Sequence, residues 1–315
     1  MKIGVSVYVV GVRNGEDKQY EIHDIGGKDL ISIVNNHAKV VIGKYDNNKS
    51  DESMFSFSRM EYKDIKTEDG KEKYEALFFS VKTGDYGVAS EIVDSETMEV
   101  TYRKKQSEAE IKTFSGCIIA PRGKHRTAAI LLQTMGRYGI ATVMKKYIDS
   151  YIKAENENDR VFFNPLMPKE FAKKIFEKGK LSSITFIRYR TPSDIADQFG
   201  IDNGTKVIRD EHKFKARGGF SKELFWDILT GKKDKSTIVS IENFDVDDIQ
   251  FNMKIGTTEK VITLSNLDKL QVHEDITEKF KEEDMESDGS PKFEPLRKIL
   301  IEMAEWYLKA KGVIM

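Results

Sequence analysis

The chain has very little of the residue chemistry on which metal and redox sites depend. Cys117 is the only cysteine among 315 residues, so no disulfide can form within the chain, which is typical of a protein of the reducing cytoplasm. No histidine lies four residues from another or beside a Cys-x-x-Cys motif, although five are present: His23, His37, His125, His212 and His273. We therefore predict neither a metal site nor a cofactor.

Long hydrophobic runs are also missing. No apolar stretch approaches the roughly 20 residues that a membrane-spanning helix needs. The apolar start of the chain, residues 1–10, is followed closely by Arg13 and Glu16, so it predicts a first strand and not a cleaved leader. We expect a cytoplasmic protein with no direct membrane insertion, which would need a partner in order to act at a membrane.

Motifs for phosphate loops and catalysis are incomplete. Gly123-Lys124 lacks the rest of a phosphate-binding loop, and residues 136–139 (Gly-Arg-Tyr-Gly) favour a tight turn over a phosphate site. A metal-dependent nuclease would place carboxylates at set spacings, but the acidic cluster at 245–248 stands at the wrong spacing from Lys254. Cys117 lies in an apolar run, which favours a buried, inert thiol. No catalytic residue is predicted.

Charge is distributed very unevenly along a nearly neutral chain. The whole sequence has 51 Lys and Arg against 52 Asp and Glu, but residues 103–217 hold 24 Lys and Arg against 13 Asp and Glu, an excess of +11. The rest of the chain therefore carries −12. A concentrated positive potential attracts polyanions, so the middle of the chain favours contact with nucleic acid.

Individual basic residues in this middle segment form the predicted DNA-binding set. Lysines and arginines that contact phosphates give affinity without sequence specificity, and salt weakens that affinity. Some are expected on loops or at a helix start, and others alternate along strands, where Asp194 and Asp197 could instead hold the strand arginines. The ten candidates are Lys124, Arg126, Arg137, Lys145, Lys146, Arg188, Arg190, Lys213, Lys215 and Arg217.

The first part of the chain is expected to be rich in strands. Residues 39–43 and 54–60 are strand-like, and Asp29 is placed to cap a short helix over 30–37. Two further runs, 76–81 and 88–93, flank a Gly-Asp turn and predict a β-hairpin.

The rest of the chain mixes helices with strands. Apolar residues from Ile140 recur at helical spacing, and residues 183–190 predict a strand. A C-terminal amphipathic helix is expected to be structural and dimer-forming, because its apolar stripe follows an acidic segment that reads as a flexible linker. We therefore predict an α+β fold with a β-rich domain over 1–112, a basic domain over 113–280, a linker over 281–291 and the helix over 292–315.

Three stretches resemble the RexA phage-exclusion family of lambdoid phages. Residues 79–89 are similar to that family's Phe-x-Val-x-x-Gly-Asp-x-x-Gly-x-Ala hairpin. Gly136-Arg137 before a helix, followed by Phe163-Asn164-Pro165 before a Lys-rich helix, repeats the family's order, and the chain ends in a comparable helix with Trp306 and Tyr307. The resemblance implies a cytoplasmic DNA-binding homodimer that acts with a small membrane protein. Kiwa-type antiphage systems pair a DNA-binding subunit with a membrane subunit in a similar way.

Three functions remain open from the sequence. The first is a non-enzymatic protein of bacterial antiphage defence that binds double-stranded DNA without sequence preference. The second is a metal-dependent nuclease whose motif is not recognisable. The third is a protein-interaction module in which basic and acidic segments pair between subunits.

Overall fold

The computed structural model divides the chain into two compact units. It describes residues 2–66, 72–136, 138–166, 179–190, 208–216, 246–255, 258–263 and 273–310, with isolated positions at 177, 220, 223, 226–227 and 232–233. The first unit combines residues 1–166 with 271–315, and the second consists of residues 167–270. The chain therefore leaves the first unit once and returns to complete it. This division differs from the boundaries expected at residues 112 and 280.

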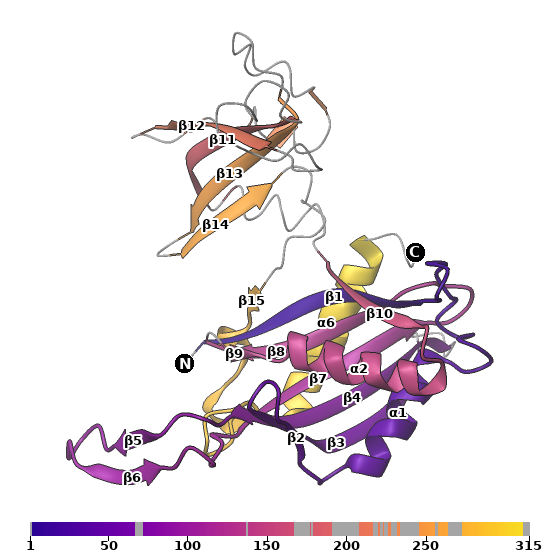
Figure 1. The fold of residues 1–315 in the computed structure, drawn as a ribbon, viewed down its shortest axis with the longest axis vertical. Coiled ribbons are helices and arrows are strands. Elements are labelled where there is room, and N and C mark those ends of the chain that lie inside the picture. The colour runs from indigo at the N-terminus through magenta and orange to yellow at the C-terminus, as the bar shows by residue number, and fades with distance from the viewer. Residues whose placement is uncertain are drawn as a thin grey trace, which may run out of the picture. The chain divides into compact units, whose positions relative to one another are not determined.

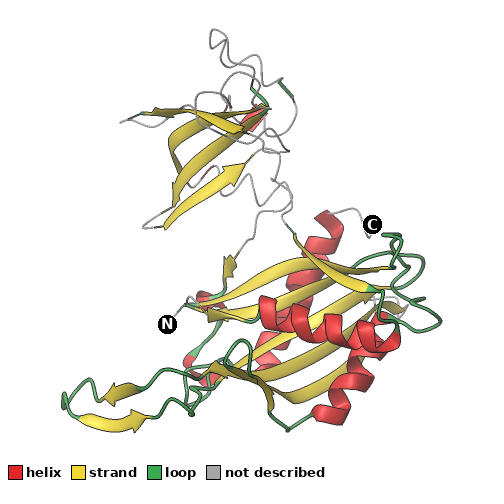
Figure 2. Ribbon diagram, viewed as in Figure 1, coloured by secondary structure: helices red, strands yellow, loops and turns green. Residues whose placement is uncertain are grey.

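A large antiparallel sheet forms the centre of the first unit (Figures 1 and 2). Its strand order is β10-β1-β8-β7-β4-β3-β2. Strand β1 pairs along one edge with β8, and along the other first with β15 and then with β10. The strands are β1 (Ile3–Arg13), β2 (Asp46–Asn48), β3 (Ser53–Lys66), β4 (Glu72–Asp85), β7 (Lys112–Pro121), β8 (Ala128–Met135), β9 (Tyr138–Gly139), β10 (Arg160–Pro165) and β15 (His273–Asp275).

Helices α1 (Leu30–Val41) and α2 (Ala141–Glu155) pack together on one face of this sheet. The Asp29 carboxylate accepts a hydrogen bond from the Ser32 backbone N–H at 2.7 Å, which confirms the expected cap. Helix α1 runs four residues beyond the expected end, so residues 39–41, expected in a strand, are helical. Helix α2 confirms the helical spacing that begins at Ile140, whose stripe is buried.

Helix α6 (Phe293–Ala310) covers the opposite face of the sheet. Its apolar stripe is almost fully buried there, with Leu296 and Leu300 at 0% and 1% exposure. Arg297 anchors the helix through an ion pair with Glu61 at 3.0 Å. The helix is therefore structural, as expected. Its stripe, however, is covered by the helix's own chain, which removes the exposed surface on which we based its expected role in dimer formation.

The segment before α6 is structured and does not behave as the linker that we expected over 281–291. Two short 3-10 turns, η3 (Thr277–Lys279) and η4 (Glu282–Asp284), follow β15. The Asp284 carboxylate accepts from the Lys281 N–H at 3.0 Å, and Met285 forms a β-bridge with Pro291. Short side-chain-to-backbone hydrogen bonds thus give a polar, acidic segment a defined path, which composition alone does not reveal.

Strands β5 (Ser90–Val93) and β6 (Val100–Lys104) form a separate two-stranded ribbon that projects from the first unit (Figure 1). The expected pairing of residues 76–81 with 88–93 is wrong. Strand β4 continues through Gly84 to Asp85 and pairs with β3 and β7, so the Gly-Asp pair lies in a strand. The turn of the ribbon comes instead at residues 94–99.

The second unit contains a four-stranded antiparallel sheet of order β12-β11-β13-β14. Its strands are β11 (Lys180–Arg190), β12 (Ile208–Lys215), β13 (Asp248–Ile255) and β14 (Thr258–Thr263). Phe186, Phe251 and Met253 are buried in it. Strand β11 confirms the strand expected over 183–190. The helices expected near Pro168 and Thr191 lie outside the described residues. With these helices and antiparallel sheets, the chain has the α+β fold that the sequence predicts.

Candidate nucleic-acid interface

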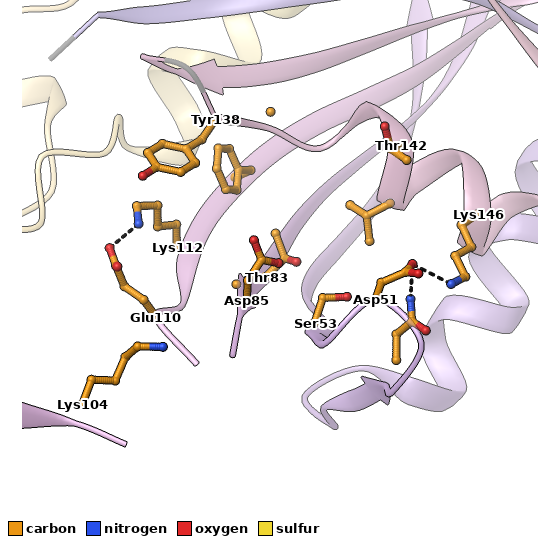
Figure 3. A pocket seen from close by; sticks show the side chains of 15 residues that line it. Asp51, Ser53, Thr83, Asp85, Lys104, Glu110, Lys112, Tyr138, Thr142 and Lys146 are labelled. Carbon is orange, nitrogen blue, oxygen red and sulfur yellow. Dashed lines mark hydrogen bonds and ion pairs between the residues drawn. The ribbon is translucent and has the colours of Figure 1, made fainter. Parts of the chain in front are cut away.

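A pocket of about 370 Å³ opens in the first unit at the start of helix α2 (Figure 3). Its walls come from the start of β3, the end of β4, the start of β7, the end of β6 and the start of α2. Six charged side chains line it, three lysines and three carboxylates: Lys104, Lys112, Lys146, Asp51, Asp85 and Glu110. Segments from far apart in the sequence therefore meet at one charged pocket.

Gly84 allows two of these walls to approach each other closely. A side-chain Cβ at this position would fall 1.9 Å from the Glu110 backbone oxygen, so only glycine fits where β4 passes the segment before β7. Glu110 and Lys112 on one side of this approach, and Asp85 on the other, all line the pocket. The glycine that the sequence marks as a turn residue is thus needed for contact between two segments.

Two of the three lysines already have carboxylate partners. Lys146 Nζ lies 2.8 Å from Asp51 Oδ2, and this hydrogen bond holds the pKa of the Asp51 carboxyl below its usual value. Lys112 forms an ion pair with Glu110, which likewise lowers the pKa of the Glu110 carboxyl. Both pairs are solvent-accessible, so they hold their lysines weakly and can exchange one anionic partner for another.

The start of helix α2 adds a favourable position for an anion. Ile140 is its N-cap residue and provides no side-chain hydrogen bond to the first turn. The first N–H groups of a helix have no partner within the helix, and they carry the positive end of the helix dipole. Thr142 and Val143, both in this first turn, line the pocket. The pocket therefore lies against a helix start and also holds lysine ammonium groups.

Four of the ten predicted DNA-binding residues lie in the first unit and are described. Lys145 and Lys146 are exposed on α2, and Lys146 lines the pocket. Lys124 and Arg126 are exposed in the loop between β7 and β8. Because β8 has 8 residues, this loop lies about 26 Å along the sheet from the pocket. The structure therefore does not gather these four residues into one surface.

Arg126 belongs to a second, shallow basic cluster. It lines a surface depression with Arg13, Lys18, Gln19 and Asp17. Two acidic side chains reduce the positive charge there, because Arg13 pairs with Asp17 at 2.9 Å and Lys18 pairs with Glu16 at 2.8 Å. Lys124 and Arg126 have no side-chain ion pair within the part of the chain that the structure describes.

The remaining predicted residues lie in the second unit or outside the described part. Arg188 is half-buried and pairs with Asp210 across strands β11 and β12 at 3.0 Å. Asp194 and Asp197, its expected partners, lie outside the described residues. Lys213 and Lys215 are exposed on strand β12. Three positions fall outside what the structure describes: Arg137, the side chain of Arg190, and Arg217.

Lys104 and Lys112 are pocket residues that sequence reasoning did not select. Both belong to a charged stretch whose spacing matches neither a helix face nor a complete motif. Lys112 Nζ also lies 4.5 Å from the centre of the Tyr138 ring, a cation–π contact between β7 and β9. Lys112 reaches the pocket because β7 pairs with β4, where Lys112 lies opposite Thr83, whereas Lys104 comes from the end of β6.

The cysteine and the acidic cluster singled out in the sequence have structural surroundings. Cys117 is fully buried, and burial raises the pKa of its thiol, which makes the thiolate scarce. The Asp247 and Asp248 carboxylates accept hydrogen bonds from the backbone N–H groups of Tyr189 and Ile249. Within the described ranges, no three His, Cys, Asp or Glu side chains are grouped as a metal site would require. No described helix is long and apolar enough to cross a membrane.

Comparison with known protein families and with characterised proteins finds no match for this chain.

Proposed function

We propose that this protein binds double-stranded DNA through the phosphate backbone and without sequence preference, with the pocket at the start of α2 as its main contact. The observation that carries the proposal is the meeting of an uncapped helix start with Lys104, Lys112 and Lys146 at one pocket. Lys145 is exposed on the same helix, one residue from Lys146. Backbone N–H groups at a helix start and lysine ammonium groups are both common phosphate ligands in proteins.

The chemistry of the pocket fits a phosphate better than a base. Lysine acts as a compact charge that contacts phosphate oxygens without reading a base edge, so such contacts give affinity and not sequence preference. Asp51 and Glu110 compete with phosphate for two of the lysines. A phosphate that enters must therefore replace these carboxylates as a partner, which limits the affinity and makes it sensitive to salt.

The resemblance to the RexA family suggests a biological setting for this binding. In that setting the protein would recognise DNA in phage exclusion and would act together with a small membrane protein. The Kiwa-type pairing of a DNA-binding subunit with a membrane subunit is an equivalent arrangement. The role in phage exclusion and the membrane partner are parts of this proposal. Each of them requires that the protein binds DNA.

Charge reversal on helix α2 tests the proposed contact. The double variant Lys145→Glu/Lys146→Glu should bind all duplexes more weakly, and the slope of log affinity against log salt should fall by roughly two. Lys153→Glu, in the last turn of the same helix, is the control and should leave binding unchanged. Fluorescence anisotropy with labelled duplexes of unrelated sequence provides the measurement. Unchanged binding by the double variant would place the DNA on another surface.

A further inference from the structure

The pocket at the start of α2 is larger than a phosphate contact alone requires. Its volume is about 370 Å³, and pockets that take small organic molecules begin at about 300 Å³. A protein contacts the phosphates of a DNA backbone from outside the duplex, so such a contact leaves most of this volume empty. The size of the pocket therefore fits a ligand that carries a second group beside its phosphate.

The two ends of the pocket differ in their chemistry (Figure 3). Lys146 and Thr142, both on α2, lie at one end together with Asp51. Tyr138 and Lys112 lie at the other end. Lys146 recognises a phosphate and not a base, but the aromatic end of the pocket takes no part in that contact. A ligand that uses both ends needs an anionic group and a flat ring.

The Tyr138 side chain is placed to stack on such a ring. Tyr138 lies on the short strand β9, which pairs with the end of β8, and it is 43% exposed. The Lys112 ammonium group lies 4.5 Å from the centre of the Tyr138 ring, so a cation–π contact steadies the ring in the pocket wall. Exposed aromatic rings beside basic side chains are common stacking platforms for nucleic-acid bases.

The Asp85 carboxylate adds a preference among the bases. It lines the pocket in the view of Figure 3 between the two ends, and its side chain has no ion pair or hydrogen bond within the part of the chain that the structure describes. An ionised carboxylate only accepts hydrogen bonds. Guanine presents two neighbouring N–H groups on its pairing edge, whereas adenine presents an amino group beside an acceptor nitrogen. Asp85 therefore favours guanine.

We propose that the pocket binds a free guanine nucleoside 5′-phosphate and that this nucleotide competes with DNA. The base stacks on Tyr138 and donates to Asp85, and the phosphate contacts Lys146. The inference rests on the proposed function, because the phosphate of either ligand meets Lys146. A nucleotide in the pocket would therefore displace the DNA backbone from this contact and make DNA binding responsive to the supply of guanine nucleotide.

Calorimetric titration of the full chain with GMP, AMP and inorganic phosphate tests the ligand class. We expect GMP to bind with a dissociation constant below about 1 mM. Its affinity should exceed those of AMP and of inorganic phosphate by about tenfold or more, because only GMP uses Tyr138 and Asp85 together with Lys146. No binding of GMP up to roughly 5 mM would overturn the proposal. Equal affinities for GMP and inorganic phosphate would overturn it too, because the pocket would then take the phosphate alone.

Two substitutions test the base contacts separately. Tyr138→Ala should weaken GMP binding by about tenfold, and Tyr138→Phe, which keeps the ring, should restore it. Tyr62→Ala removes another tyrosine of 43% exposure that does not line the pocket, and it is the matched control. Asp85→Asn should bring the affinities for GMP and AMP close together. Full GMP affinity in Tyr138→Ala, or an equal loss in Tyr62→Ala, would rule out the stacked base.

A competition experiment separates this inference from the proposed function. GMP should displace a labelled blunt duplex from the wild-type protein, as measured by fluorescence anisotropy. Binding of GMP without any binding of DNA would sink the proposed function and leave the nucleotide site standing, although not its competition with DNA. Binding of DNA that GMP neither displaces nor accompanies would sink the nucleotide site alone.

A strand end is the other source of the same chemical group. A duplex that ends in an overhanging, 5′-phosphorylated guanine nucleotide should bind no more tightly than the blunt duplex, because we assign the pocket to the free nucleotide. Tighter binding of the overhanging duplex that is lost in Tyr138→Ala would assign the pocket to strand ends and overturn the proposal.

Discussion

At the scale of single residues, Asp51 is the side chain that most directly controls the proposed phosphate contact. Its carboxylate holds Lys146 Nζ at 2.8 Å and carries a negative charge into the pocket. The lowered pKa of Asp51 means that this carboxylate stays ionised throughout the neutral and mildly acidic range. DNA must therefore compete with Asp51 for the lysine under all ordinary conditions.

Removing this competition should strengthen DNA binding. We expect Asp51→Asn to raise the affinity for any duplex by about threefold to tenfold at low salt, because it frees Lys146 and removes one repulsive charge. Glu283→Gln removes the same charge from an exposed ion pair with Lys281 and is the matched control. Fluorescence anisotropy on both variants checks the result. Equal or weaker binding by Asp51→Asn would show that the phosphate does not reach Lys146.

At the scale of elements, helix α6 holds one face of the large sheet in place. Leu300 is 1% exposed and lies in the cluster formed by α6 with strands β1, β4, β7 and β8. We expect Leu300→Ala to lower the free energy of unfolding by about 2–5 kcal/mol, because it leaves a cavity in this core. Glu302→Ala, on the exposed side of the same helix, should change it by less than about 0.5 kcal/mol. Urea denaturation measures both, and equal stability of the two variants would contradict this role.

Local sequence patterns predict the helices and several strands, because capping residues and apolar spacing act over a few residues. Asp29 correctly marks the start of α1, and the apolar residues from Ile140 correctly give α2. Pairing between strands joins residues that lie far apart in the sequence, so local patterns predict it poorly. Gly84-Asp85 is typical of a turn, yet β4 continues to Asp85 because β3 pairs with both residues, Gly84 with Met54 and Asp85 with Ser53.

The candidate site is predictable only in part for the same reason. Lys145 and Lys146 follow from the helical pattern of α2 and from the local excess of basic residues. The partner of Lys146 is Asp51, which lies 95 residues away in sequence, and no local pattern connects them. The apolar stripe of α6 likewise predicts that this helix is buried. The stripe alone does not show whether the sheet of the same chain or a second chain covers the helix.

At the scale of the whole molecule, the fold neutralises much of the basic charge that the sequence concentrates in its middle. Lys146 pairs with Asp51, and Arg122 pairs with Glu75 and Asp64, all acidic residues from the first part of the chain. The excess of +11 over residues 103–217 therefore overstates the charge that is free to attract DNA. We expect DNA binding that rests on a few phosphate contacts and not on a broad basic surface.

The most direct test of the central claim is the affinity of the wild-type protein for two unrelated duplexes of equal length, measured by anisotropy across a range of salt. We expect equal affinities for both sequences. We also expect a fall of about 150-fold between roughly 50 and 200 mM salt, which corresponds to four phosphate contacts, one for each of the four lysines of the proposed contact. Absence of binding at roughly 50 mM salt, or a clear preference for one of the two sequences, would contradict it.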